Sequence, residues 1–273
     1  YPFDEILLPL WKYAADNKIP ILTHTIKGTI FYRGKKKKEW DYHEVFKQAN
    51  GLKEYGPLLL PQLKNIDFIN NFTHPLNFLC LLEEKLLRVL VGNGSKEIQT
   101  LFGFSDFKTP LKHSLNHLKL CFGHFGGEDE WQRFFENDRD NVTSQLIKMP
   151  EKGIVFVKDG PIEDSFGSLE LIWKNTDWYS IISSMMLQYE NLYADLSYII
   201  HDEKIFPLLK QTLQNNRLRK RVLFGTDFYV VRNHKSEKEM LADLRLSLND
   251  NEFEMLTYEN PKEFLNISEI SKE

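Results

Sequence analysis

Short apolar runs recur along the chain, and each of them ends on polar residues. Four are clear: residues 19–24 (I-P-I-L-T-H), 118–127 (L-K-L-C-F-G-H-F-G-G), 191–197 (N-L-Y-A-D-L-S) and 221–228 (R-V-L-F-G-T-D-F). Runs of this length are typical of strands that are buried on both faces of a parallel sheet. Because helical patterns lie between them, the sequence predicts an α/β fold in which strands alternate with helices.

The helical patterns begin with recognisable caps. Asp4 precedes a helix whose apolar face is predicted to hold Ile6, Leu7, Leu10, Trp11 and Ala14. Thr73 or His74 can cap a helix over residues 73–90, with Pro75 in its first turn. Further helices are predicted at residues 128–137, at 177–186 after a cap by Thr176 or Asp177, at 202–215, at 236–248 with a Ser236 and Glu239 capping box, and at 261–265. Met185 and Met186 are interpreted as core residues.

A long segment separates the first two predicted strands. It spans about 90 residues, whereas a crossover between parallel strands needs only about a dozen. We therefore expect one domain over residues 1–273, with a helical insertion at about 26–112. Within it, residues 35–38 are four lysines of a solvated loop, residues 40–49 are a short helix and residues 91–109 are a loop. Residues 138–167 mix turn formers with one apolar run and receive no assignment.

Composition narrows the class of protein and its partners. The chain has 273 residues, 42% of them hydrophobic and 27% charged, with a net charge of −4. This charge gives no reason to expect nucleic acid or an anionic membrane as a partner. Its apolar runs are far shorter than the about 20 residues of a membrane helix. Cys80 and Cys121 cannot form a disulfide framework, so a cytoplasmic protein is expected, with Cys121 a small buried residue of its strand.

Histidine and aspartate lie at the ends of the predicted strands. The first two runs end on His24 and His124, the third on Asp195 and Ser197, and the fourth on Asp227. In α/β sheets, chemistry takes place at the carboxyl ends of the strands, which share one edge. Imidazole and carboxylate groups are zinc ligands, so His24, His124 and Asp227 are predicted to converge as a metal site.

Neighbouring residues allow other roles. Asp227 could instead cap the next helix or turn, and Gly225 before it is expected to free the backbone. His113 and His117 have the i, i+4 spacing of a metal pair on a helix. They precede the strand, however, which puts them about 20 Å from the carboxyl edge at about 3.3 Å per residue. They are interpreted as polar positions on a packing helix.

Five motifs occur in order: residues 20–25 (P-I-L-T-H-T), 122–127 (F-G-H-F-G-G), 193–197 (Y-A-D-L-S), 224–228 (F-G-T-D-F) and 259–265 (E-N-P-K-E-F-L). Together they resemble the carboxyl-terminal half of the amidohydrolase superfamily, in its amidohydrolase 2 branch of metal-dependent TIM-barrel hydrolases and decarboxylases. The resemblance implies strands five to eight of a (β/α)8 barrel. It also implies a divalent metal, first of all Zn²⁺, and a small-molecule substrate.

The resemblance assigns roles to the strand-end residues. His24 would be a metal ligand, and His124 a second-metal ligand or a catalytic acid/base. Asp227 would contact the metal and take a proton from the attacking water. Hydrolysis of a C–N or ester bond and decarboxylation of a carboxylic acid both fit this arrangement.

One departure from the family pattern is large. The family carries a His-x-His pair on strand one, and no such pair occurs in this sequence. The chain is therefore expected to be an amino-terminally truncated barrel. The strand at residues 19–22 is then expected to have an unpaired outer edge, or an edge covered by another chain or a further segment. The alternatives are a non-catalytic binding module that lacks the metal site and a scaffold fragment that assembles with another chain. The oligomeric state stays open, and a homo-oligomer is allowed.

Overall fold

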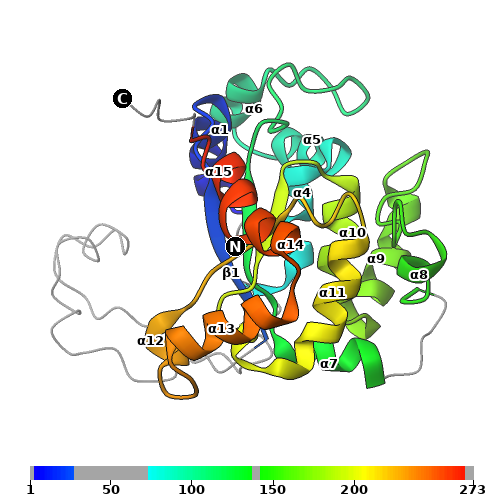
Figure 1. The fold of residues 1–273 in the computed structure, drawn as a ribbon. Helices are drawn as coiled ribbons and strands as arrows, with labels where there is room; N and C mark the ends of the chain where they lie inside the picture. The colour runs from blue at the N-terminus through cyan, green and yellow to red at the C-terminus, as the bar shows by residue number, and fades with distance from the viewer. Residues whose placement is uncertain (1–2, 28–72, 137–141, 268–273) are drawn as a thin grey trace, which may run out of the picture.

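Four parallel strands form one sheet in the order β1-β2-β3-β4. Figure 1 shows the fold of the chain, with β1 labelled. The computed structural model describes residues 3–27, 73–136 and 142–267. Its strands are β1 Ile21–Ile26, β2 Leu120–Gly126, β3 Leu192–Asp195 and β4 Val222–Leu223. The predicted α/β class and its four strands are confirmed, although β1 and β2 begin later than expected and β4 is only 2 residues long.

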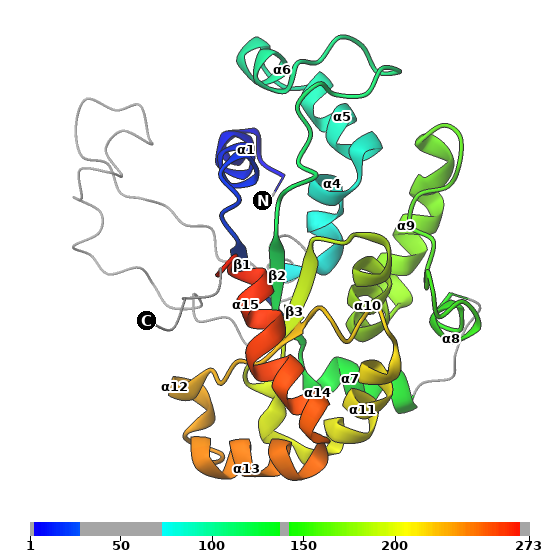
Figure 2. The ribbon, with the colours of Figure 1, turned by 45° about the horizontal axis from the view of Figure 1, so that its top comes forward.

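The register of the sheet aligns the strand ends. Ile21 pairs with Leu120, Leu120 with Leu192, and Ala194 with Val222. Because all the strands are parallel, the residues that follow them reach the same edge. Helices α7, α12 and α13 lie beyond this carboxyl edge, and α1, α5 and α6 lie beyond the amino ends (Figure 2).

The amino-terminal part of the chain forms short helices. They are η1 Glu5–Leu7, α1 Leu8–Asp16, η5 Pro75–Phe78, α4 Leu79–Leu82, α5 Glu84–Gly92 and α6 Lys96–Phe102. The helix at 73–90 is confirmed with its His74 cap, but it breaks where Glu83 adopts an extended backbone and caps α5. The predicted loop at 91–109 is wrong in part, because Ser95 caps α6 and Gly103 ends it at φ 61°. The predictions for 35–38 and 40–49 lie outside the described residues.

The predicted caps of the carboxyl-terminal half are confirmed. The side chain of Asp177 accepts from the Ser180 amide, and Ser236 with Glu239 forms the capping box. The helices are α7 Glu128–Glu136, α8 Gln145–Lys148, α9 Glu163–Asn175, α10 Trp178–Gln188, η6 Ile199–His201, η7 Glu203–Ile205, α11 Phe206–Gln214, α12 Phe228–Val231, α13 Glu237–Ser247, α14 Asp250–Glu254, η8 Met255–Glu259 and α15 Asn260–Phe264. Helices α8 and α9 begin within the unassigned stretch, where neither has a side-chain cap.

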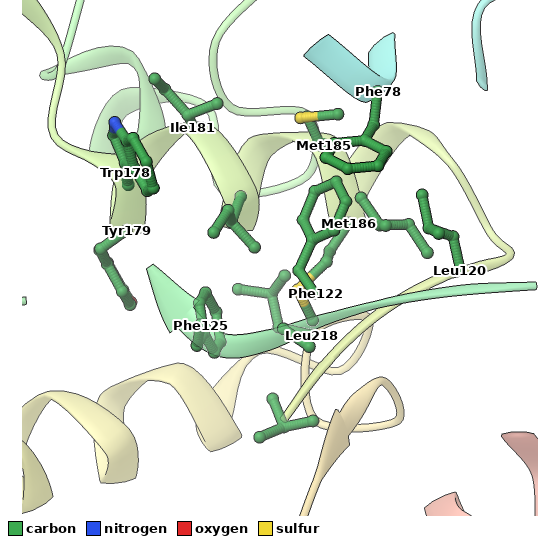
Figure 3. Close-up of a cluster of buried hydrophobic side chains, with 14 of the residues drawn as sticks. Phe78, Leu120, Phe122, Phe125, Trp178, Tyr179, Ile181, Met185, Met186 and Leu218 are labelled. Carbon is green, nitrogen blue, oxygen red and sulfur yellow. The ribbon is translucent and has the colours of Figure 1, made fainter. Parts of the chain in front are cut away.

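The main core lies between the sheet and α10. Figure 3 shows Phe122 and Phe125 of β2 against aromatic, isoleucine and methionine side chains of α10. Met185 and Met186 are fully buried there, as predicted. On the opposite face, Cys121 packs in a smaller cluster with Tyr193, Leu223 and Phe264 of α15. Strands β2, β3 and β4 are thus buried on both faces, which explains their nearly continuous apolar sequences.

The first helix and β1 are only partly covered. Trp11 and Ala14 of α1 are buried, but Ile6 is 81% and Leu10 52% exposed, so only part of the predicted apolar face is packed against the protein. Leu22 of β1 is 61% exposed. Among the described residues β1 pairs with β2 alone, which leaves the outer edge that the sequence predicted. None of the described helices has the length and apolarity needed to cross a membrane.

Candidate functional site

A pocket of about 500 Å³ opens at the carboxyl edge of the sheet. Residues that belong to or follow all four strands line it, together with residues of α15 and its end. His24, His124 and Asp227 are all among them. The structure therefore brings the three predicted site residues to one pocket.

The two histidines face each other across β1 and β2. Their ring centroids are 4.7 Å apart and their planes are 77° apart, an edge-to-face contact. Surrounding protein atoms, first, and the charge of His124, second, lower the pKa of His24, although part of this side chain is open to solvent. Asp227 and Asp195 act in the opposite direction on that pKa. The net lowering favours a neutral His24, whose nitrogen lone pair is then free to bind a proton or a cation.

His124 is held by the residue that follows β3. Its Nδ1 lies 3.0 Å from the carbonyl oxygen of Ser197 and 3.1 Å from the Ser197 Oγ. A carbonyl oxygen can only accept, so Nδ1 carries the hydrogen in this arrangement. In the neutral ring, Nε2 then keeps its lone pair. This is the orientation that an outer hydrogen bond gives to a metal-binding or basic histidine.

Asp195 joins the ends of β2 and β3. Its side chain is almost fully buried, and its Oδ1 accepts from the His124 amide at 3.0 Å, the Ser197 amide at 2.9 Å and the Ser197 hydroxyl. Burial first, and the Asp195 charge second, raise the pKa of Cys121, whose Sγ lies 3.8 Å from Oδ2. Sequence reasoning found Asp195 and Ser197 at a strand end but gave them no role. Their spacing, D-x-S at the carboxyl end of a buried strand, is the signal that could have found them.

The carboxylate of Asp227 has no hydrogen-bond partner among the residues that the structure describes. Helix α12 begins directly after it, but its side chain makes no capping hydrogen bond, and its backbone carbonyl accepts from the Val230 and Val231 amides. Nor does this carboxylate form an ion pair with any residue that the structure describes. A side-chain cap was the alternative to a chemical role, and the geometry does not support it.

Unusual backbone conformations gather around the pocket. His124 has φ 65°, Phe125 42°, Tyr198 68° and Asp227 50°, all in the left-handed region that disfavours side chains. Such conformations cost roughly 1–3 kcal/mol each and cluster at functional sites. Gly225 does not share a positive φ, so the expectation that it frees the backbone is wrong. It gives space instead, because a Cβ there would lie 2.9 Å from the Ser197 Cβ.

The donor types around the pocket fit a divalent ion, but they do not form a closed ligand set. Two imidazoles and one carboxylate are the ligands that Zn²⁺ takes in catalytic sites. Within the described ranges, however, no three His, Cys, Asp or Glu side chains lie close enough together to hold one ion. An ion here would need either movement of Asp227 toward the histidines or a further ligand.

Among the other described histidines, His74 caps η5 and four more form two pairs. His201 and His234 have ring centroids 4.7 Å apart, next to the ring of Tyr198, and do not line the pocket. His113 and His117 do not line the pocket and are exposed. They lie in a bend and a turn rather than on the helix that was predicted for them.

A larger pocket, of about 610 Å³, lies away from the strand ends. Side chains of η5, α4, α5 and α9 make up most of its lining, which is mainly apolar apart from Asn77, Asn93 and Glu170. Burial raises the pKa of its Cys80 to about 12, so this thiol is not a nucleophile at neutral pH. The imidazole and carboxylate side chains of His24, His124 and Asp227 line the smaller pocket instead.

Comparisons of the chain with protein-family models, with curated proteins and with solved structures found no match.

Proposed function

We propose that the pocket at the carboxyl edge is the active site of a metal-dependent hydrolase or decarboxylase of the amidohydrolase type. One observation carries this proposal: His24 and His124 lie edge to face at 4.7 Å, in one pocket with the uncapped carboxylate of Asp227. The pocket lies where α/β enzymes carry out their chemistry. Its volume of about 500 Å³ suits a small molecule as substrate.

The sheet topology supports a barrel origin for this site. Consecutive strands of a (β/α)8 barrel are parallel neighbours, and β1 to β4 have this order. We propose that they correspond to strands five to eight. The motif residues named in the sequence then supply the residues that line the pocket, from His24 on β1 to Phe264 on α15.

In the proposed mechanism, His24 and Asp227 would hold a divalent ion, with Zn²⁺ first, and His124 would be either a further ligand or the acid/base, because its single free lone pair serves one role at a time. A bound ion of this kind lowers the pKa of water toward about 7 and polarises a carbonyl or carboxyl oxygen. His124 offers Nε2 to a proton, because its Nδ1 is committed to Ser197. Asp227 offers a carboxylate with no other hydrogen-bond donor among the residues described, so it can accept a proton from water.

Metal content and turnover test the proposal together. We expect one tightly held divalent ion per purified chain, and hydrolysis or decarboxylation of at least one member of a panel of amides, esters and carboxylic acids. His24→Gln and His124→Gln should lower metal content and turnover. His113→Gln is the matched control, because His113 is exposed and lies outside the pocket. If the wild-type chain holds no ion and turns over no substrate, the proposal that it is an enzyme is rejected.

A non-catalytic binding module is the second candidate. The absence of a three-ligand set among the described side chains favours it. In this case His24, His124 and Asp227 would hydrogen-bond a small polar ligand. Calorimetric titration of chelator-treated chain with such ligands distinguishes the two, because binding without metal and without turnover fits only the module.

A further inference from the structure

Tyr198 is the centre of a strained γ-turn directly after β3. Its φ of 68° and ψ of −60° are those of the rarer γ-turn type, and the Ile199 amide donates to the Ser197 carbonyl at 2.8 Å to close the turn. A side chain makes this conformation costly, whereas glycine adopts it freely. A tyrosine at this position therefore calls for an explanation in the contacts around it.

The carbonyl that closes the turn also binds His124. Ser197 O accepts from the Ile199 amide and, at 3.0 Å, from His124 Nδ1, so both of its lone pairs are used. Asp195 fixes the other end of the same residue through the Ser197 amide. Gly225 lets the Ser197 side chain approach β4 closely. The direction of this carbonyl, and with it the hydrogen bond to His124, depends on the turn.

The side chain of Tyr198 holds the turn in place. Its ring lies edge-on to His124, with centroids 6.3 Å apart, and 4.6 Å from the ring of His201. The His201 Nδ1 lies 2.6 Å from the Tyr198 carbonyl, and burial first, then the nearby charge of Glu128, raise the pKa of the Tyr198 hydroxyl. These contacts over-determine a conformation that the backbone alone disfavours.

We propose that Tyr198 is a positioning residue, whose γ-turn holds His124 as the Nδ1–H tautomer and leaves Nε2 as the open acceptor in the pocket. The reversed tautomer would present an N–H where the proposed reaction needs a lone pair. The catalytic meaning of this device rests on the proposed function, but the tautomer itself does not. If the turn served only to connect β3 to η6, the His124 tautomer would not respond to residue 198.

Tautomer-sensitive ¹⁵N NMR of histidine-labelled, chelator-treated chain tests the proposal. Removing metal matters, because an ion on Nε2 would impose the same tautomer. His124→Gln assigns the signal. At a pH above the imidazole range we expect Nδ1–H at His124 in the wild-type chain, in Tyr198→Gly, which retains the turn, and in Ser197→Ala, which retains the carbonyl.

Tyr198→Val is the variant expected to break the device, because a β-branched residue resists positive φ. Both tautomers of His124 should then be populated. Nε2–H in the wild-type chain, or an unchanged Nδ1–H signal in folded Tyr198→Val, would overturn the proposal. If Tyr198→Val does not fold, the ¹⁵N signal of His124 is measured in Tyr198→Ala instead. Alanine also lacks the tyrosine ring, and it does not adopt positive φ as freely as glycine does.

Thermal melting adds a test of the turn. Tyr198→Gly and Tyr198→Ala lose the same ring, and only alanine has a Cβ to strain at φ 68°. We expect the glycine variant to melt at the higher temperature, and the reverse order would reject the γ-turn. Absence of metal or turnover would count against the proposed function and leave these results unchanged.

Discussion

Two groups of polar side chains lie near the carboxyl ends of β1 and β2, and their hydrogen bonding differs. In the first, the buried carboxylate of Glu130 contacts Lys27 at 3.0 Å, Arg133 at 3.4 Å and the Trp178 amide at 2.8 Å. In the second, the Asp227 carboxylate has no such partner among the described residues, and His24 contacts His124 through the ring edge.

The difference shows that the Glu130 group serves the packing of the fold, whereas the Asp227 group is open to a ligand. The oxygens of the buried Glu130 carboxylate are occupied by three donors, and removing this carboxylate would leave those donors unpaired. The Asp227 carboxylate has no such partner among the described residues, so its oxygens are open to a ligand. The strained backbones at His124 and Asp227 point in the same direction, because a fold optimised for stability alone avoids them.

The largest expected effect comes from breaking the structural group. Glu130→Ala leaves Lys27, Arg133 and the Trp178 amide without their shared acceptor. We expect the free energy of unfolding to fall by about 3 kcal/mol. Denaturant unfolding measures it, with Glu136→Ala on the same helix as the control, because that side chain is exposed. Equal losses in the two variants would show that Glu130 has no special structural role.

Asp227→Asn changes the available group and should have the opposite profile. The amide keeps the shape and one oxygen donor but removes the basic carboxylate. We expect turnover per bound metal to fall at least about 100-fold, while the melting temperature and much of the metal are retained. The assay uses the amide, ester and carboxylate panel beside a thermal melt. Wild-type turnover at wild-type metal content would remove Asp227 from the mechanism.

The buried His74 should make the free energy of unfolding depend on pH. Burial lowers its pKa from 6.5 to about 3, so the unfolded chain binds the proton more tightly between these values. Its contribution to stability is therefore present above pH 6.5 and is lost as the pH falls, by at most about 1.4 kcal/mol per unit. His74→Asn retains an N-cap for η5 and should remove this slope.

The measurement is the difference between wild type and His74→Asn in the free energy of unfolding. Wild type alone would mislead, because burial raises the pKa of Asp177 to about 6 and gives a slope of opposite sign. The Asp177 carboxyl binds its proton more tightly in the folded chain. Its contribution to the free energy of unfolding is therefore lost as the pH rises from 3.8 to about 6. A pH-independent difference between the two proteins would contradict the low pKa of His74.

Regular elements could be predicted from the sequence where the local signal is strong. The four strands have dense apolar runs, and Asp177 and Ser236 are effective caps. Strands β1 to β4 and helices α10 and α13 were therefore predicted correctly. Helix α9 was missed because it starts without a side-chain cap. The exposure of Ile6 and Leu10 could not be predicted, because periodicity shows that a face is apolar and not what covers it.

The sequence predicted the main residues of the site but not the hydrogen bonds that hold them in place. His24, His124 and Asp227 were found because they end apolar runs. The roles of Asp195 and Ser197 depend on hydrogen bonds between strands that are far apart in sequence. The γ-turn at Tyr198 has no local signal, since residue type indicates positive φ only for glycine and, less strongly, for Asn, Asp and His. Tertiary contacts impose it.

The smallest effect is expected from alanine substitutions of two glycines, one at the pocket and one in a helix. Gly225→Ala would place a Cβ 2.9 Å from the Ser197 Cβ, so Ser197 must shift. Such overpacking costs about 1 kcal/mol or more. Gly167 lies inside α9, and a Cβ added there would meet no atom within 4 Å. Alanine at this position should therefore stabilise the protein by about 0.5–1 kcal/mol through helix propensity.

The two glycine variants should also differ in function. Because Ser197 orients His124, we expect Gly225→Ala to lower turnover and to populate both tautomers of His124, and Gly167→Ala to change neither. Melting temperature, turnover and the ¹⁵N signal are measured on both. A stabilised Gly225→Ala with unchanged turnover would mean that the approach to Ser197 is not needed, and that the contrast between packed and available regions does not extend to β4.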